Sequence, residues 1–156
     1  MILRGYGLTI PPFFIVGDNY CMTSSPYHKL ITAYNGLFKD DIEIKCDYGW
    51  GTIIEDMCFS LDYMIIDNPN PTIFQINKIE NLFGVLNIEY DYADIHAKKI
   101  IDFAQRLSYH TCETCGNKGK IYCSNKWLTW SKYKVLCKQH AIKYFYYEIR
   151  HPKGKT

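Results

Sequence analysis

"TCETCGNKGKIYCSNKWLTWSKYKVLCKQH" spans residues 111–140 and contains two pairs of metal-binding side chains. Cys112 and Cys115 form the first pair, and Cys137 and His140 form the second with the same two-residue spacing. Two thiolates held two residues apart on a tight turn can bind one ion. Three cysteines and one histidine complete the closed tetrahedral shell of structural zinc. The spacing therefore predicts one structural Zn²⁺, bound by Cys112, Cys115, Cys137 and His140.

Two further residues of this region are candidate ligands. Cys123 has no partner at ligand spacing and alternates with Tyr122 in a strand-like run, so we expect it to be a packed free thiol. His110 lies two residues before Cys112, but the end of a preceding helix would turn it away, and a helix C-terminus favours a histidine there. In the alternative interpretation, Cys112 and Cys115 are ordinary thiols and His140 is a surface histidine. This interpretation does not explain why the residues occur as two pairs with the same spacing.

The residues between and after the pairs predict the shape of the module. Gly116 allows the backbone to curl behind the first pair, and "GKIYC" (119–123) and "KYKVLC" (132–137) predict the two strands of a hairpin. A last helix is expected over 138–149. This order is typical of a treble-clef or zinc-ribbon-like module. We expect four side chains of the last helix to dock on the rest of the domain, namely Ile142, Phe145, Tyr146 and Ile149.

Composition and charge describe the whole chain. Of its 156 residues, 47% are hydrophobic, which predicts one domain with a real core. Residues 1–109 carry eight basic and fourteen acidic residues, a net charge of −6, whereas residues 110–156 carry ten basic and two acidic residues, a net charge of +8. We expect a small mixed α+β domain with an acidic part, 1–109, and a basic zinc module, 110–156. The asymmetry indicates an anionic partner or contact between the two parts.

The acidic part predicts strands or loops followed by helices. Turn residues interrupt 1–48, and the alternation in "DIEIKCDY" (41–48) predicts a half-buried strand. Apolar residues recurring at three and four predict a helix over 50–66, and Ile73, Ile76, Ile79 and Phe83 predict another over 72–83, with Gly84 as its C-cap.

The remainder of the acidic part predicts one strand and one helix. "VLNIEYDY" (85–92) alternates as a strand does. A third helix is expected over 94–109, with Asp94 as its N-cap. Its expected buried face consists of Ile100, Phe103, Ala104 and Leu107.

Catalytic patterns are absent from the sequence. Catalytic zinc keeps an open coordination position with three protein ligands, whereas four ligands are available here. No histidine is followed two residues later by Glu, as deaminases require, and no H-E-x-x-H motif occurs. The residues between the ligand pairs contain no His or Asp, which argues against treble-clef nucleases. Glu55-Asp56 and Asp91/Asp94 are interpreted as solvated helix faces and caps, so we predict a protein that is not an enzyme.

The basic module interleaves lysines with aromatic residues. Lysines that neutralise phosphates beside aromatic platforms are typical of nucleic-acid binding. In the alternative interpretation, the aromatics form a small core over the zinc and the lysines solubilise the hairpin. The candidate partner-binding residues are Lys118, Lys120, Lys126, Trp127, Trp130, Lys132 and Lys134.

No segment approaches the roughly 20 apolar residues of a membrane helix. The N-terminus is interrupted by Arg4, two glycines and Pro11-Pro12, unlike a secretory signal. We therefore expect an intracellular protein that does not associate with membranes. Its seven cysteines are then metal ligands and free thiols.

The order of motifs resembles a family of uncharacterised phage and prophage zinc-binding proteins over about residues 46–145. Its pattern is a "GW" before a helix, a "K-x-x-F-G-x-L" segment, then "S…C-x-x-C-G…G…W…L-C-x-x-H". The chain departs from it at Asn87, where a basic residue is common, and at the extra Cys123. The matching residues are Gly49, Trp50, Lys78, Phe83, Gly84, Leu86, Ser108, Cys112, Cys115, Gly116, Gly119, Trp127, Leu136, Cys137 and His140.

The resemblance implies a zinc-stapled fold in a viral or prophage setting, hence the bacterial host cytoplasm, and it implies no reaction. Two functions are compatible with it. The first is an accessory or regulatory protein that binds nucleic acid through the basic aromatic module. The second is a phage-encoded inhibitor that binds a host protein, for which a surface rich in Tyr and Trp is suitable.

Overall fold

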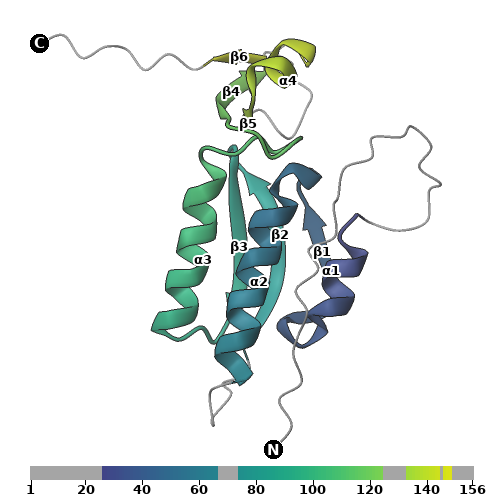
Figure 1. The fold of residues 1–156 in the computed structure, drawn as a ribbon, viewed down its shortest axis with the longest axis vertical. Coiled ribbons are helices and arrows are strands. Elements are labelled where there is room, and N and C mark those ends of the chain that lie inside the picture. The colour runs from purple at the N-terminus through teal and green to yellow at the C-terminus, as the bar shows by residue number, and fades with distance from the viewer. Residues whose placement is uncertain (1–25, 67–73, 125–132, 145, 149–156) are drawn as a thin grey trace, which may run out of the picture.

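The computed structural model describes residues 26–66, 74–124, 133–144 and 146–148. It has an α+β architecture with two three-stranded sheets, and the second sheet lies at one end of the first layer (Figure 1). The predictions for residues 1–25, Phe145 and Ile149 lie outside the described residues. No helix in the described part of the chain combines the length and the apolar character needed to cross a membrane.

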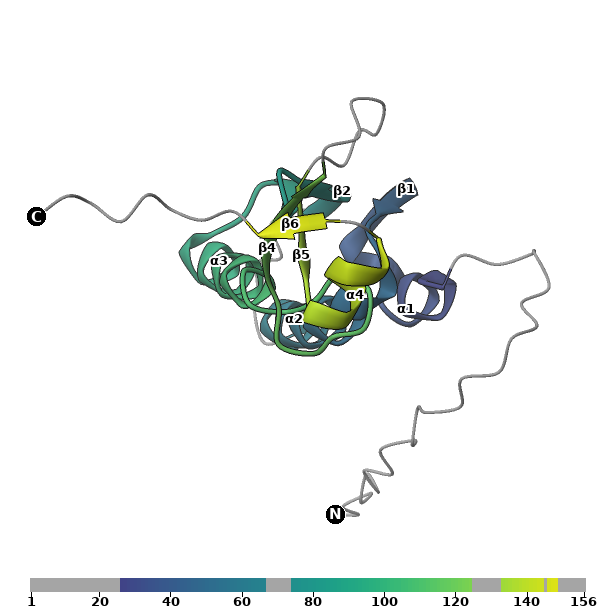
Figure 2. The same cartoon turned by 90° about the horizontal axis from the view of Figure 1, so that it is seen from above.

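The first sheet has the strand order β1-β2-β3. β1 (Phe38–Lys45) is parallel to β2 (Gln75–Leu82), and β2 is antiparallel to β3 (Val85–Asp91). α2 (Gly51–Ile66) connects the parallel strands, as a parallel pair requires a long crossover. α2 and α3 (Ile95–Ser108) run in opposite directions, side by side on one face of the sheet (Figures 1 and 2).

Several predicted elements of this layer are confirmed. The helix expected over 50–66 is α2, and the strand expected over 85–92 is β3, with Leu86 and Ile88 buried. Asp94 is the N-cap of α3, because its carboxylate accepts hydrogen bonds from the backbone N–H groups of His96 and Ala97. β1 begins three residues before the alternating stretch that predicted it.

Short elements that the sequence did not predict stand before and after β1. α1 (His28–Ala33) and the 3₁₀ turn η1 (Asn35–Leu37) precede the strand, and the 3₁₀ turn η2 (Tyr48–Trp50) follows it. Tyr27 and Leu37 are each 1% exposed, so these pieces contribute to the core despite their length.

The prediction of a helix over 72–83 is wrong, because residues 75–82 form β2. A bulge shifts the register between Ile76 and Lys78, so Ile76 and Ile79 both face the core although they are three residues apart. This spacing imitates a helical period. Gly84 is not a C-cap: Phe83 and Gly84 have φ values of 54° and 88° and form the two-residue turn between β2 and β3.

The buried face of α3 agrees with the prediction at Ala104 and at the partly buried Ile100, and it differs at the other two positions. Ala97, Ile101, Ala104 and Ser108 are buried, whereas Phe103 and Leu107 are 64% and 40% exposed. Small residues let α3 approach the sheet closely, and the Ser108 hydroxyl accepts a hydrogen bond from the Leu86 N–H while donating to the carbonyl of Gln105. A pattern search for large apolar residues misses such a face. The core of this layer is built largely from Trp50, Ile54, Leu61, Ile76, Ile79, Leu86 and Ile101.

The second sheet has the strand order β5-β4-β6 and is antiparallel throughout. The predicted hairpin is confirmed as β4 (Lys120–Ser124) and β5 (Tyr133–Leu136). α4 (Lys138–Lys143) packs beside it, as Figure 2 shows from above. The helix expected over 138–149 is therefore wrong after Lys143, since the chain returns as β6 (Tyr146–Glu148) and pairs with β4. Consecutive aromatic residues favour this strand, and Ile142 is 65% exposed rather than docked.

Candidate metal centre

The four predicted ligands meet at the junction of the two sheets. Cys112 and Cys115 lie on the loop between α3 and β4, Cys137 is the N-cap of α4, and His140 lies one turn into that helix. The four side chains can offer one sulfur or nitrogen atom each, and all of these atoms lie within 4.8 Å of one another. The fold thus brings the predicted ligands together, although Cys115 of the first pair and Cys137 of the second are 22 residues apart in sequence.

The distances between ligand atoms fit one tetrahedral ion. The sulfurs of Cys115 and Cys137 are 3.8 Å apart, and Nδ1 of His140 lies 3.6 Å from the Cys112 sulfur and 3.3 Å from the Cys137 sulfur. Zn–S bonds of about 2.3 Å and Zn–N bonds of about 2.0 Å give tetrahedral edges of about 3.8 Å between sulfurs and about 3.5 Å between sulfur and nitrogen. The residues present could therefore hold one metal ion through three sulfurs and the histidine Nδ1.

Local backbone geometry positions the first pair. The Gly116 N–H donates to the Cys112 carbonyl at 2.8 Å, and Gly116 has a φ of 76°, a conformation that glycine adopts without strain. The Cys112 N–H donates to the carbonyl of Asn117 at 2.7 Å, and Thr111 pairs with Lys118 in an isolated bridge. The Glu113 N–H, between the two cysteines, donates to the Val135 carbonyl of β5 at 2.8 Å, so the loop is closed on itself and also fixed to the second sheet.

The second pair begins a helix, and the helix modifies the acidity of its cysteine. Partial burial raises the pKa of Cys137, but the backbone N–H of His140 and hydrogen bonds with the Cys115 and Cys112 thiols outweigh it. The Gln139 N–H adds a smaller contribution, and the pKa lies below its ordinary value. Burial raises the pKa of Cys112 to about 11. Because a metal ion binds the thiolate, binding at Cys112 displaces a proton and the affinity of the site increases with pH.

The two remaining candidate ligands stand apart from this cluster. Cys123 lies on β4 as a partly buried free thiol, and its sulfur approaches the carbonyl oxygen of Ser124 at 3.6 Å. His110 is exposed at the end of α3. Neither belongs to the group of four ligand atoms, as predicted from their spacing.

Glu113, between the first two cysteines, is a functional residue that the sequence reasoning missed. It is 1% exposed. Its carboxylate accepts hydrogen bonds from the Asp47 N–H at 3.2 Å and from the side-chain amide of Asn81, and it lies 3.6 Å from the Lys134 ammonium. Burial raises the pKa of Glu113, and the attraction of Lys134 opposes that shift. The carboxylate thus joins the metal loop to β2 and to the loop after β1.

Lys134 completes this buried group. Its ammonium lies 2.9 Å from the Asp47 carboxylate as well as 3.6 Å from that of Glu113, and its side chain is only 17% exposed. Burial alone would lower its pKa, but the two carboxylates raise it above the ordinary value. The prediction that Lys134 contributes to a partner-binding surface is therefore corrected: its charge is neutralised inside the chain.

Gly49 and Trp50 form the seat of the metal loop. The Gly49 N–H donates to the Glu113 carbonyl at 2.7 Å, and the Trp50 Nε1–H donates to the Thr111 carbonyl at 2.8 Å. A Cβ atom on Gly49 would lie 2.3 Å, 2.4 Å and 2.5 Å from backbone atoms of Cys112, Glu113 and Cys115. Only glycine permits this approach. The Gly-Trp pair before α2 was the sequence signal for the contact.

Apolar contacts extend the junction beyond the polar group. Val135 of β5 is fully buried in the core of the first layer. The turn between β2 and β3 meets the hairpin as well, because the Phe83 and Tyr133 rings lie 6.5 Å apart and Gly84 faces Ile121. The basic module and the acidic part are therefore packed on one another, which is one of the two explanations that the charge asymmetry allowed.

The other predicted partner-binding residues have different positions. Lys118 and Lys120 are exposed at the start of the hairpin. Lys126, Trp127, Trp130 and Lys132 lie outside the described residues.

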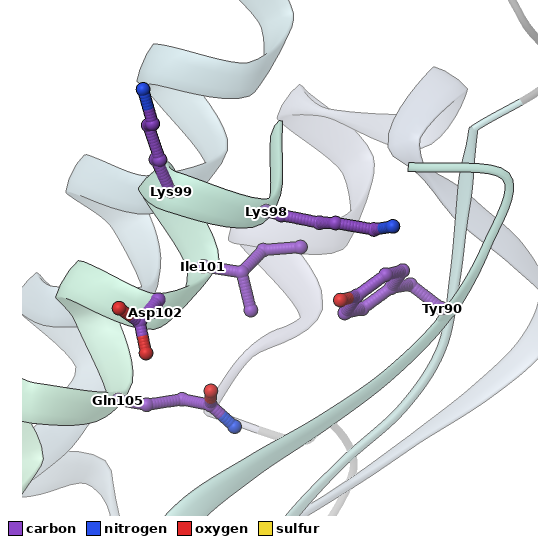
Figure 3. Close-up of a pocket in the computed structure, with 6 residues that line it drawn as sticks. All are labelled: Tyr90, Lys98, Lys99, Ile101, Asp102 and Gln105. Atoms are coloured by element: carbon purple, nitrogen blue, oxygen red, sulfur yellow. The ribbon is translucent and has the colours of Figure 1, made fainter. Parts of the chain in front are cut away.

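An open depression between α3 and β3 lies away from the metal cluster (Figure 3). Its single carboxylate, Asp102, forms an ion pair with Arg106 at 2.7 Å, and the lining holds no nucleophile beside a base. The residues that line it are Tyr90, Lys98, Lys99, Ile101, Asp102 and Gln105.

Comparison with protein-family models, curated proteins and solved structures gives no match. The site is accordingly defined by its own geometry: four convergent ligand atoms on a loop and a helix start, seated on Gly49-Trp50 and on a buried ion pair. The resemblance to phage zinc-binding proteins remains a prediction from the motifs.

Proposed function

We propose that the chain is a non-enzymatic zinc-binding protein in which one structural Zn²⁺ fixes the C-terminal module to the rest of the fold. The observation that carries this proposal is the set of three sulfurs and one nitrogen at tetrahedral distances. Four protein ligands leave no position for water or substrate, which distinguishes a structural site from a catalytic one. The ion supports folding rather than a reaction.

Metal analysis tests this proposal. Protein purified without chelators should contain about one zinc per chain, and Cys112→Ser or Cys137→Ser should lose it. Cys123→Ser is the matched control, because Cys123 lies outside the cluster and its sulfur is not needed for binding. Equal zinc content in Cys112→Ser and Cys123→Ser proteins would contradict the proposed ligand set.

We further propose that the basic module binds nucleic acid, in a phage or prophage setting that the motif resemblance suggests. The net charge of +8 over residues 110–156 supports this, although Lys134 no longer contributes to the surface. The described lysines that remain exposed in the module are Lys118, Lys120, Lys138 and Lys143. Lys143 lies 5.6 Å from the centre of the Tyr144 ring, and His140 stacks on the same ring.

Titration with a single-stranded oligonucleotide at several salt concentrations tests the second proposal. Affinity should decrease steeply with salt, because each neutralised phosphate releases counterions. Changing Lys118 and Lys120 to Gln should reduce the salt slope by about 2. Changing Lys39 and Lys98 to Gln removes the same charge from the first layer and serves as the control. If the two variants reduced the salt slope equally, the proposal that the basic module binds nucleic acid would be overturned. A nuclease-resistant complex with a host protein would instead favour the inhibitor.

A further inference from the structure

The outer face of the helical layer carries four large apolar side chains that the fold leaves exposed. Phe59 and Tyr63 of α2 are 64% and 65% exposed, and Phe103 and Leu107 of α3 are 64% and 40% exposed. Contiguous exposed apolar surface of this kind marks an interaction site rather than a solvated helix face. The metal centre does not involve this face.

Helical spacing places these four residues on one surface. On α2, Phe59 and Tyr63 are one turn apart and lie opposite the buried residues Ile54 and Leu61. On α3, Phe103 and Leu107 are also one turn apart. The two helices are neighbours on the same face of the sheet (Figure 1). Their outer surfaces therefore form one apolar strip.

The flank of α3 that faces away from α2 is identified by the depression in Figure 3. Lys98 extends toward Tyr90 of β3 there, and Gln105 also lines that side. Ile100, on the other flank of the helix, packs against the core. Phe103 consequently lies on the side nearer α2, and Lys99 borders the strip on the outer side.

The two outer borders of the strip carry opposite charges at matching intervals. Lys99 and Arg106, seven residues apart, border it on α3 and are exposed. Glu55 and Asp62, also seven residues apart, border it on α2. Both pairs therefore span about 10.5 Å along their helices.

Helical spacing gives the position of the acidic border. Glu55 and Asp62 each lie one turn from the buried Cys58, whereas Asp56 points to the other flank of α2. Tyr34, which follows α1, lies close enough to this side for Glu55, Cys58 and Asp62 to raise its pKa, in addition to the effect of burial. Glu55 and Asp62 therefore lie on the α1 side of α2, away from α3.

Symmetry determines which partner fits such a strip. A two-fold axis parallel to the helices places the basic border of one copy on the acidic border of the other, and the opposed helices are then antiparallel. Because α2 and α3 run in opposite directions, Lys99 meets Asp62 of the second copy and Arg106 meets Glu55. A two-fold axis across the helices would instead oppose like charges. Asp56 lies on the same side of α2 as Tyr63, close to the two-fold axis that runs parallel to the helices. It therefore faces Asp56 of the second copy, and the repulsion between the two carboxylates weakens the association.

We propose that the α2–α3 face is a homodimer interface in which four helices pack around Phe59, Tyr63, Phe103 and Leu107. The Asp102–Arg106 pair within each chain is exposed, so Arg106 can exchange partners at little cost. The dimer presents two basic modules on one particle. This inference does not depend on the identity of the metal or on nucleic-acid binding.

Sedimentation equilibrium of the full chain over a concentration series tests the interface. Wild-type protein should dimerise, and the double change Phe59→Asp with Phe103→Asp should give a monomer with unchanged circular dichroism. Ile142→Asp, which places one aspartate on a helical residue of α4 that is as exposed as Phe59 or Phe103, should leave the dimer intact. A wild-type monomer throughout the series, or a dimer that survives the double change, would overturn the proposal.

Charge reversal tests the orientation separately. Glu55→Lys and Arg106→Glu should each weaken self-association on the order of tenfold, because two exposed pairs become repulsive in each dimer. An equimolar mixture of the two variants should recover most of the wild-type affinity, since every pair in the mixed dimer is again of opposite sign. A mixture that associates no better than either variant would contradict the proposed two-fold axis.

Discussion

The two sheets of this protein are stabilised in different ways. The first layer buries a cluster of large apolar residues between one sheet face and two helices, including Trp50, Leu61 and Ile79. The described part of the second sheet has a core of its own that consists of Cys112, Tyr122, Leu136 and Ala141. Such a small core does not offset the conformational entropy of ordering the segment, and small modules generally need a metal ion or disulfides. We therefore expect the second region to depend on the proposed ion and on its contact with Gly49 and Trp50.

The junction shows the same dependence. It contains a buried carboxylate, a nearly buried ammonium and a glycine in backbone contact with the metal loop. Buried charges are tolerated only when they are paired and hydrogen-bonded. The metal loop must therefore be in place for Glu113 and Lys134 to be satisfied.

Loss of a metal ligand should separate the two regions most strongly. Cys112→Ser, or chelation of the wild-type protein, is expected to unfold residues 111–124 and 133–144 while the first layer stays folded. Hydrogen exchange measured by mass spectrometry checks this, since amides of β4 and β5 should lose protection and those of α2 and β2 should keep most of theirs. Cys123→Ser should resemble wild type. Simultaneous loss of protection in both layers would show that the regions are one cooperative unit.

Substitution of the seat should have the next largest effect. Gly49→Ala places a methyl group at most 2.5 Å from three backbone atoms, so the metal loop must move. We expect a loss of about 3 kcal/mol or more in the free energy of unfolding, measured with urea, together with weaker zinc retention. Gly36→Ala adds the same atom where nothing lies within 4 Å and should change stability little. Equal stability of the two variants would contradict the described approach.

The buried ion pair should contribute less than the seat. Lys134→Met leaves Glu113 buried without its cation and should cost about 2–3 kcal/mol, after allowance for the partial exposure of the lysine. Adding Glu113→Gln should recover part of that loss, because the amide needs no counter-charge. Lys118→Met is the control, because Lys118 is exposed in the isolated β-bridge with Thr111 and its loss should change stability little. If the second change worsened the loss instead, the coupling of these two charges would be disproved.

The smallest effect concerns the first layer alone. Asp94→Ala removes the N-cap of α3 and should cost about 1 kcal/mol, with no change in zinc content. Urea unfolding and metal analysis of the same sample check both parts. Zinc loss in this variant would mean that α3 and the metal loop are more tightly coupled than their contacts indicate.

Local spacing was sufficient to predict the metal centre, whereas long-range contacts were not predictable. The two ligand pairs each lie within one turn of chain, so their spacing specified all four ligands and excluded Cys123. The partners of Glu113 are Asp47, Asn81 and Lys134, which come from three other elements. Nothing in a run of sequence indicates that those elements meet.

The errors in the predicted elements have local physical causes. The bulge in β2 gave Ile76 and Ile79 a helix-like spacing, and small residues concealed the buried face of α3. Phe103 and Leu107 dominated the pattern of α3 although the chain itself does not bury them. Apolar residues that a sequence pattern assigns to a core can therefore belong to an interface, which the proposed dimer illustrates.

The most direct test of the account is native mass spectrometry of the full chain combined with hydrogen exchange, before and after chelation. We predict one zinc per chain, and loss of the ion should expose the amides of β4 and β5 while α2 and β2 remain protected. A folded, metal-free chain whose second sheet stays protected would contradict the claim that the metal holds this region in place.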